Sequence, residues 1–156
     1  YGTGDNYDKQ SSHVMASFIK KFSDAKFNNE DNVTCWGSGK PEREFLHVED
    51  LAEASIFCLE KWNPSDKNSP KDLKGEPLSF LNIGTGIDIS IESLAEKIAN
   101  LTDYKGRIIW DTSKPDGTPK KLLNISRIKT LGWEPKINLD EGIKRTIKEY
   151  QLKYLR

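Results

Sequence analysis

The chain has 156 residues, and its 24 lysines and arginines balance 24 aspartates and glutamates to a formal net charge of zero. Because no overall field draws it to nucleic acid or to a membrane surface, neither is an expected partner, and any site for an anion must be local. The length suits one domain, and the lack of a signal peptide or a long apolar stretch favours a soluble, cytoplasmic protein. Cys35 and Cys58 are too few for a disulfide framework and are not spaced as metal ligands, so we expect both to be buried.

The first third of the chain predicts one helix and two short strands. After a turn-rich opening, Ser11 or Ser12 can cap a helix that runs toward Ala25 with apolar residues at helical spacing. Short strands are expected over 33–36 and 42–46.

A second helix is expected over 48–61, and a polar surface insertion over 63–77 follows it. The apolar stripe of this helix is expected to face the core and consists of Val48, Leu51, Ala52, Ser55 and Leu59. The insertion contains three prolines and many lysines, which is typical of a surface loop.

The next part of the chain predicts strands over 78–83 and 107–110, with a helix between them. Ser90 is expected to cap this helix. The residues expected on its buried face are Ile91, Leu94, Ala95, Ile98 and Ala99.

Two helices are expected near the end of the chain. A short one over 126–131 should stop at Gly132, which fits a left-handed cap. Asn138 with Glu141 makes a capping-box-like start for the last helix. The residues that this helix should turn inward are Leu139, Ile143, Ile147 and Tyr150.

These elements indicate an α/β protein, or an α+β one when the residues are taken alone, with 1–156 forming a single unit. The strands are too few and too scattered for a complete doubly wound sheet, and the chain opens at Tyr1 without an initiator methionine. We therefore expect a further part of the sheet upstream.

The segment 36–50 carries the strongest signal for a binding site. Trp36 offers a flat face for a base, the glycines that follow it let a backbone approach a ligand, and Arg43 can grip phosphate through two hydrogen bonds. A nucleotide-sugar site needs all three kinds of group. The alternatives are that Trp36 belongs to the core and that Arg43 forms a surface ion pair with Glu42 or Glu44, worth under ~1 kcal/mol.

A second candidate is the loop 113–121, whose prolines restrict its conformations. Asp116 and the lysines, among them Lys121, could be held ready for a ligand at low entropic cost. The alternative is a plain polar connection between a strand and a helix. In the same way, Arg107 could be a solvated edge charge, and Lys21 a cation that suits the negative end of its helix.

Two histidines could act as a general acid or base near neutral pH. His13 lies at the start of the first helix, and His47 precedes the second, where a capping role is expected. No cysteine or aspartate partner is visible beside either. The chain also lacks a Walker loop, zinc-ligand spacing and a Gly-x-Gly-x-x-Gly fingerprint after a strand.

Taken together, these residues resemble the carboxy-terminal half of the GDP-L-fucose synthases, a family of extended short-chain dehydrogenases/reductases. The stretches that carry the resemblance are 1–6, 12–14, 36–39, 43–48, 82–86, 113–119 and 131–133. Those over 12–14 and 113–119 are specific to the fucose synthase branch, whereas the opening, 43–48 and 82–86 are similar across many nucleotide-sugar epimerases and dehydratases.

The resemblance implies an enzyme that converts GDP-4-keto-6-deoxy-D-mannose to GDP-L-fucose by epimerising C3 and C5 and then reducing C4 with NADPH. It implies that His13 is the catalytic acid and a contact to the cofactor. The family's catalytic cysteine, the serine, tyrosine and lysine of its hydride step and its glycine fingerprint for NADPH are absent. This chain alone is therefore expected to be inactive, and its full-length parent to be a homodimer.

The resemblance also implies a set of contacts to the GDP-sugar, made by Lys21, Trp36, Arg43, Arg107, Asp116 and Lys121. Trp36 would lie against guanosine, Asp116 would accept hydrogen bonds from guanine or ribose, and the two arginines with Lys121 would hold diphosphate or sugar oxygens. Lys21 stands where the family has an arginine and cannot give the same bidentate grip. Glu42 adds a negative charge that would weaken phosphate binding.

Two alternatives remain open from the sequence. One is another nucleotide-sugar epimerase or dehydratase, which would prefer UDP or dTDP to GDP. The other is a non-catalytic nucleotide-binding module.

Overall fold

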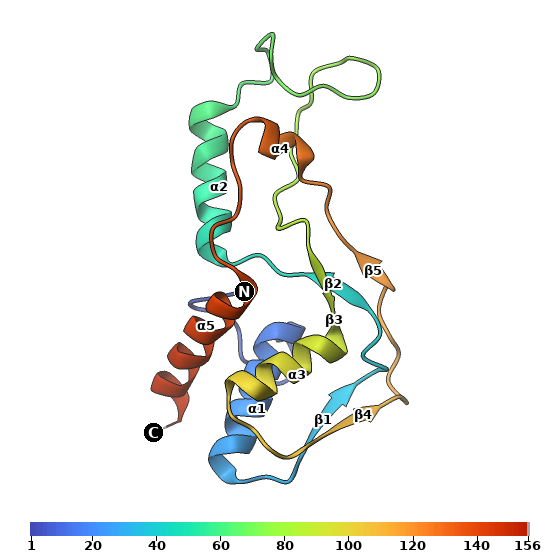
Figure 1. Ribbon diagram of the computed structural model, residues 1–156, viewed down its shortest axis with the longest axis vertical. Helices are drawn as coiled ribbons and strands as arrows, with labels where there is room; N and C mark the ends of the chain where they lie inside the picture. Colours follow the sequence, from blue (N-terminus) through green and yellow to red (C-terminus); the bar gives the residue numbers. More distant parts are fainter. Residues whose placement is uncertain (156) are drawn as a thin grey trace.

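Three helices pack around a pair of parallel strands at one end of the molecule (Figure 1). The structure, a computed structural model, describes residues 1–155. The elements of this end are α1 (Val14–Asn28), β1 (Asn32–Trp36), α3 (Ile91–Leu101), β4 (Arg107–Asp111) and α5 (Leu139–Tyr154). Their buried apolar side chains form one cluster that includes Phe22, Ile98 and Ile143, each fully buried. This cluster is the main core.

A smaller core lies at the other end of the molecule. Here α2 (Val48–Lys61) packs against α4 (Ser126–Thr130) and the segments around it. The buried apolar residues are Ala54, Ile125, Ile128 and Trp133. The connection over 62–87 contains no helix or strand and projects from this end (Figure 1).

A small mixed sheet lies between the two cores (Figure 1). Its strands are β2 (Glu42–Glu44), β3 (Asp88–Ser90) and β5 (Lys120–Lys121), in the order β3-β2-β5. The central strand β2 is antiparallel to β3 and parallel to β5. Because β1 pairs with β4 and β2 pairs with β5, the loops 37–41 and 112–119 run from one sheet to the other together. The pairing of these two loops positions the candidate site.

Local sequence signals for the helix ends are confirmed. The Ser90 side chain accepts a hydrogen bond from the Ser93 N–H, and the Asn138 side chain accepts one from the Glu141 N–H. Gly132 follows α4 with a φ of 101°, as expected for a residue that ends a helix in the left-handed region. The mixture of helices and small sheets also confirms the α/β class.

The start of the first helix differs from the prediction. His13, rather than Ser11 or Ser12, is the residue that precedes the first turn of α1. The Ser11 hydroxyl instead donates to the Asp8 carboxylate at 2.9 Å and so belongs to the preceding turn. The Ser11 side chain therefore bonds within the preceding turn and does not cap the helix.

The strand predicted over 78–83 is wrong. No strand forms there. Leu81 and Ile83 instead pack against the smaller core. The alternating pattern therefore marks an irregular segment that is buried on one side.

The predicted core face of α2 is also wrong. Every residue of the proposed stripe is exposed, and Leu59 is 87% exposed. The helix buries Asp50 and Ala54 instead, and the Asp50 carboxylate accepts the backbone N–H groups of Lys136 and Ile137 at 3.1 and 3.0 Å. This pair of bonds fixes the rotation of α2.

The two cysteines differ in burial. Cys35 is fully buried in β1, where desolvation raises the pKa of its thiol to about 11, so it stays protonated as an apolar group. Cys58 is only half-buried, against the smaller core. Among residues 1–155, no helix is both long and apolar enough to cross a membrane.

Candidate functional site

Two loops from distant parts of the chain are held together by one carboxylate. The Asp116 carboxylate accepts hydrogen bonds from the Ser38 hydroxyl at 2.6 Å and from the Ser38 N–H at 2.8 Å. These two bonds, the hydroxyl first, hold the pKa of Asp116 below its usual value. Gly37 is needed at this contact because a Cβ there would lie 2.5 Å from Asp116 Oδ1. The glycine and proline loops thus form one structure.

This contact changes the role expected for Asp116. The sequence suggested that its oxygens accept hydrogen bonds from a ligand, and two bonds are already made to Ser38. A carboxylate has about four acceptor positions, so it can still accept one from a ligand. Its first role in this structure is to join the loops, and Ser38, which the sequence did not single out, is its partner.

Arg43 and Lys121 lie side by side on neighbouring strands. They are paired in register between β2 and β5. The Arg43 guanidinium donates to the backbone oxygen of Glu42 at 2.7 Å, and a Cβ on Gly117 would lie 2.9 Å from its Nη2 atom. The loop backbone at Gly117 therefore passes directly beside the guanidinium, and two cationic residues are neighbours on adjacent strands of the small sheet.

The ion pair considered for Arg43 does not form. Glu42 instead pairs with Lys120 at 2.8 Å, and the Glu44 carboxylate accepts backbone N–H groups. Among the described residues no carboxylate is paired with Arg43. Its charge is thus available to an anion from outside, whereas Glu42 shares Lys120 with Asp88.

Trp36 is 65% exposed at the end of β1, so the alternative of a core tryptophan is wrong. The ammonium groups of Lys21 and Lys114 each lie 5.6 Å from the centre of its rings. Lys21 also donates to the backbone oxygen of Thr34 at 2.8 Å, which holds it beside the indole. An exposed aromatic face flanked by two cations suits a ligand that carries both a flat ring and negative charge.

His13 lies close in sequence to a hollow between α1 and β1. Ser12, Lys21 and Trp36 all line that hollow. The His13 side chain is exposed and forms no capping hydrogen bond to the helix that it precedes. Its imidazole is therefore accessible to solvent, although His13 itself is not among the residues that line the hollow.

His47 has the capping role that the sequence predicted. It is buried, and its Nδ1 atom accepts the Glu49 N–H at 3.3 Å. Desolvation lowers the pKa of His47, so the ring is neutral near pH 7. We assign it to the start of α2 and not to the candidate site.

The structure does not bring Arg107 to the other predicted contacts. Its register partner is Asn32 at the start of β1, whereas Trp36 at the other end of β1 pairs with Asp111. Four residues of strand separate the two ends by roughly 13 Å. The Arg107 side chain donates to the Asn32 carboxamide at 3.1 Å. Its contact with a diphosphate stays a prediction of the resemblance alone.

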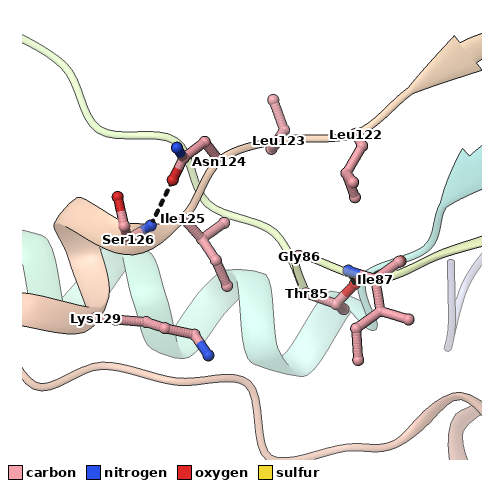
Figure 2. Close-up of a pocket in the computed structure, with 9 residues that line it drawn as sticks. All are labelled: Thr85, Gly86, Ile87, Leu122, Leu123, Asn124, Ile125, Ser126 and Lys129. Carbon is pink, nitrogen blue, oxygen red and sulfur yellow. Dashed lines mark hydrogen bonds between the residues drawn. The ribbon is translucent and has the colours of Figure 1, made fainter.

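A further hollow lies between the segments 85–87 and 122–126 (Figure 2). Its lining is largely apolar, with Leu122 and Leu123 on one side and Lys129 at its edge. None of the predicted site residues lines it. Its two sides are, however, the segments that adjoin β3 and β5.

Comparisons with known proteins show which proteins the chain is similar to. The model of the NAD dependent epimerase/dehydratase family matches residues 1–72. A putative GDP-L-fucose synthase 2 of Arabidopsis thaliana is 41% identical over 150 residues, which are 96% of this chain and 42% of that protein. The GDP-L-fucose synthase of Escherichia coli is 43% identical over 146 residues, which are 94% of this chain and 44% of that protein. The chain thus spans less than half the length of these relatives.

Solved structures show the same fold. A GDP-6-OMe-4-keto-L-xylo-heptose reductase from C. jejuni superposes with a TM-score of 0.85 at 31% identity, covering 98% of this chain and 51% of that one. A GDP-L-fucose synthetase from Naegleria fowleri bound to NADP gives a TM-score of 0.80 at 26% identity, covering 99% and 45%. The fold is therefore that of part of an extended short-chain dehydrogenase/reductase. More closely, the chain is similar in sequence to the NAD dependent epimerase/dehydratase family over residues 1–72 and to the GDP-L-fucose synthases over nearly its whole length.

Proposed function

We propose that this chain supplies the GDP-sugar-binding surface of an NADPH-dependent epimerase-reductase that makes GDP-L-fucose. The observation that carries the proposal is the Ser38–Asp116 contact, which places the loop after Trp36 against the loop before Lys121. A flat aromatic face and two cationic side chains then border one pair of joined loops. The GDP-L-fucose synthase relatives support guanine as the base and a 6-deoxyhexose as the sugar.

Each group has a role that its chemistry suits. The exposed face of Trp36 stacks on the guanine ring, with Lys21 and Lys114 beside it. Arg43 and Lys121 bind the diphosphate, because arginine can hold two phosphate oxygens at once and lysine adds a point charge. Charge-assisted bonds of this kind contribute roughly 1.5–3 kcal/mol each.

His13 is proposed as the acid of the epimerisation. A 4-keto group acidifies the hydrogens on C3 and C5 because the carbanion left behind is an enolate. Inversion then requires a proton to be removed from one face and returned to the other, so one positioned group must donate it. The accessible imidazole of His13, whose chain neighbour Ser12 lines the hollow with Trp36, is the candidate donor.

The described residues do not fit a complete NADPH site. In the short-chain dehydrogenases the pyrophosphate lies on a glycine-rich turn between a strand and a helix. Here the turn after β1 leads to β2, and the N–H groups of Thr85 and Gly86 in the other glycine-containing turn are bound by Glu44. NADPH would supply the hydride for C4. We expect no NADPH oxidation by the chain alone, and assign that step to residues outside it.

Isothermal titration of the chain with GDP, UDP and dTDP tests the proposal. We expect GDP to bind, and Arg43→Ala or Trp36→Ala to weaken it by about tenfold or more, which is 1.4 kcal/mol. Arg145→Ala is the matched control, because that arginine pairs with Glu141 on α5, away from the two loops. Preference for UDP or dTDP would favour another nucleotide-sugar enzyme of the family. Equal binding by wild type and both site variants would refute the proposal.

A further inference from the structure

We infer that Glu44 is a positioning residue, which holds Lys121 beside Arg43 so that both can face one diphosphate. The inference rests on the proposed function for its ligand but not for its geometry. Glu44 lies in β2 directly after Arg43, and nothing in its sequence context distinguishes it from a solvated acidic side chain. In the structure, its carboxylate joins three separate segments of the chain.

The carboxylate bridges the two neighbours of its own strand. Its Oε1 atom accepts the N–H groups of Thr85 at 2.6 Å and Gly86 at 2.5 Å, in the turn that precedes β3. Its Oε2 atom accepts the N–H of Leu123 at 3.0 Å, in the segment that follows β5. One side chain therefore ties β3 and β5 to β2 from both sides.

The hydrogen bonds of the Glu44 side chain lie just beyond the backbone pairing of β2 with its two neighbouring strands. The β2–β3 pairing ends at Glu44 with Asp88, and the β2–β5 pairing ends at Arg43 with Lys121. β5 has only two residues, and the ion pairs of Lys120 with Glu42 and Asp88 hold its first residue against both neighbouring strands. The bond from Leu123 to Glu44 extends the pairing and keeps Lys121 opposite Arg43.

Figure 2 shows the segments that this carboxylate links. Residues 85–87 and residues 122–126 border the apolar hollow from two sides. The Ile125 side chain packs closely against Gly86, so the two sides meet at one point. Glu44 adds a connection from β2 to each side through N–H groups on both.

The surroundings of Glu44 are built for a carboxylate. No basic side chain among residues 1–155 forms an ion pair with it, so its charge is balanced by aligned backbone N–H groups. A Cβ at position 84 would lie 2.5 Å from its Oε1 atom, so Gly84 leaves room for the carboxylate. A Gly84→Ala substitution would thus displace the carboxylate without removing it.

The sign of one measurement separates positioning from simple electrostatics. If Glu44 were only a negative charge near the diphosphate, its removal would strengthen GDP binding, because like charges repel. If it holds Lys121 in place, its removal weakens GDP binding although a negative charge has been lost. It should also leave the binding of guanosine, which has no phosphate, unchanged.

The binding test compares Glu44→Ala, Glu44→Gln and Gly84→Ala with wild type. We expect Glu44→Ala and Gly84→Ala to weaken GDP about tenfold with no change for guanosine. Glu44→Gln should fall between them and wild type, because its amide oxygen can still accept the N–H groups of the turn while its NH₂ cannot accept that of Leu123. Glu53→Gln, which changes a carboxylate of α2 paired with Lys136, is the matched control and should bind as wild type does.

Amide hydrogen exchange tests the geometry without a ligand. The N–H groups of Thr85, Gly86 and Leu123 should exchange at least about tenfold faster in Glu44→Ala than in wild type, with the core amides of α3 unchanged. Unaltered exchange at all three, or GDP binding as tight as wild type or tighter, would overturn the inference. Equal losses for GDP and guanosine would show a general structural defect and would overturn it too. A wild-type chain that fails to bind GDP would refute the proposed function, and the exchange rates alone would then decide whether Glu44 joins the segments.

Discussion

At the scale of single residues, the candidate site depends on two acidic side chains that form hydrogen bonds within the chain. Asp116 and Glu44 are both carboxylates that a sequence would assign to a ligand or to an ion pair. Each instead accepts backbone N–H groups, Asp116 from Ser38 and Glu44 from three residues. The cations beside them, Arg43 and Lys121, are consequently left without carboxylate partners among the described residues. Because these carboxylates are bonded to backbone N–H groups, the positive charges of Arg43 and Lys121 remain free for an anion.

Substitution of Gly37 tests the close approach of the two loops. Gly37 has a φ of 82° and Gly75 a φ of 86°, so alanine is strained to the same extent at both. Both Gly37→Ala and Gly75→Ala should therefore lower the free energy of unfolding by about 1 kcal/mol, measured in urea. Only at Gly37 would the new Cβ meet Asp116, because nothing lies within 4 Å of the one at Gly75. Gly37→Ala should thus also weaken GDP binding, and equal affinity in the two variants would contradict the account.

The closed loop pair should depend on pH through Asp116. Its pKa lies below the usual value of 3.8 in the folded chain because of the bonds from Ser38. Since the folded pKa is the lower one, the stabilisation is fully present above pH 3.8 and is lost as the pH falls through the folded pKa. The Ser38 amide resonance should follow this titration in NMR spectra. Ser38→Ala should return the Asp116 pKa toward its usual value, and an unchanged titration would show that the contact is not what lowers it.

At the scale of elements, the helices differ in how far their own sequence determines them. The caps of α3 and α5 are formed by side chains within three residues of the bonds they make, so the sequence predicts them correctly. The buried face of α2 is set by amides of Lys136 and Ile137, some 86 and 87 residues from Asp50. Apolar periodicity within α2 could not reveal that contact. The strand expected over 78–83 does not form either, and Leu81 and Ile83 of this segment pack against residues of the smaller core that are distant in sequence.

Removal of the Asp50 side chain tests what holds α2 in place. Asp50→Ala would leave the N–H groups of Lys136 and Ile137 without their acceptor in a partly buried place. We expect a loss of about 2–4 kcal/mol in the free energy of unfolding, from two charge-assisted hydrogen bonds. Glu53→Ala, on the same helix and half exposed, should cost less than ~1 kcal/mol. Equal losses would mean that Asp50 is not what fixes the rotation of the helix.

At the scale of the whole molecule, two cores are joined by a three-stranded sheet, and the candidate site lies along the loops that lead into that sheet. The sequence could suggest most of the candidate residues that the structure groups around the two loops, because they cluster in short segments with special composition, such as the one after Trp36. It could not show that Arg107 lies at the far end of β1 and β4, since strand register is not visible in the composition of a strand. It could not show the roles of Ser38 and Glu44 either, because their partners lie 78 residues away in one case and 41 to 79 in the other.

The central claim is that distant segments of this chain bind one molecule of GDP together. Its most direct test is a ¹H–¹⁵N NMR titration with GDP, in which the shifts of backbone amides and of the Trp36 indole are mapped onto the structure. The account predicts that the indole and the amides of Ser38, Gly117 and Lys121 move together with a single dissociation constant, while the amide of Arg145 on α5 does not move. Shifts confined to one of the two loops, or different constants for the two, would contradict it.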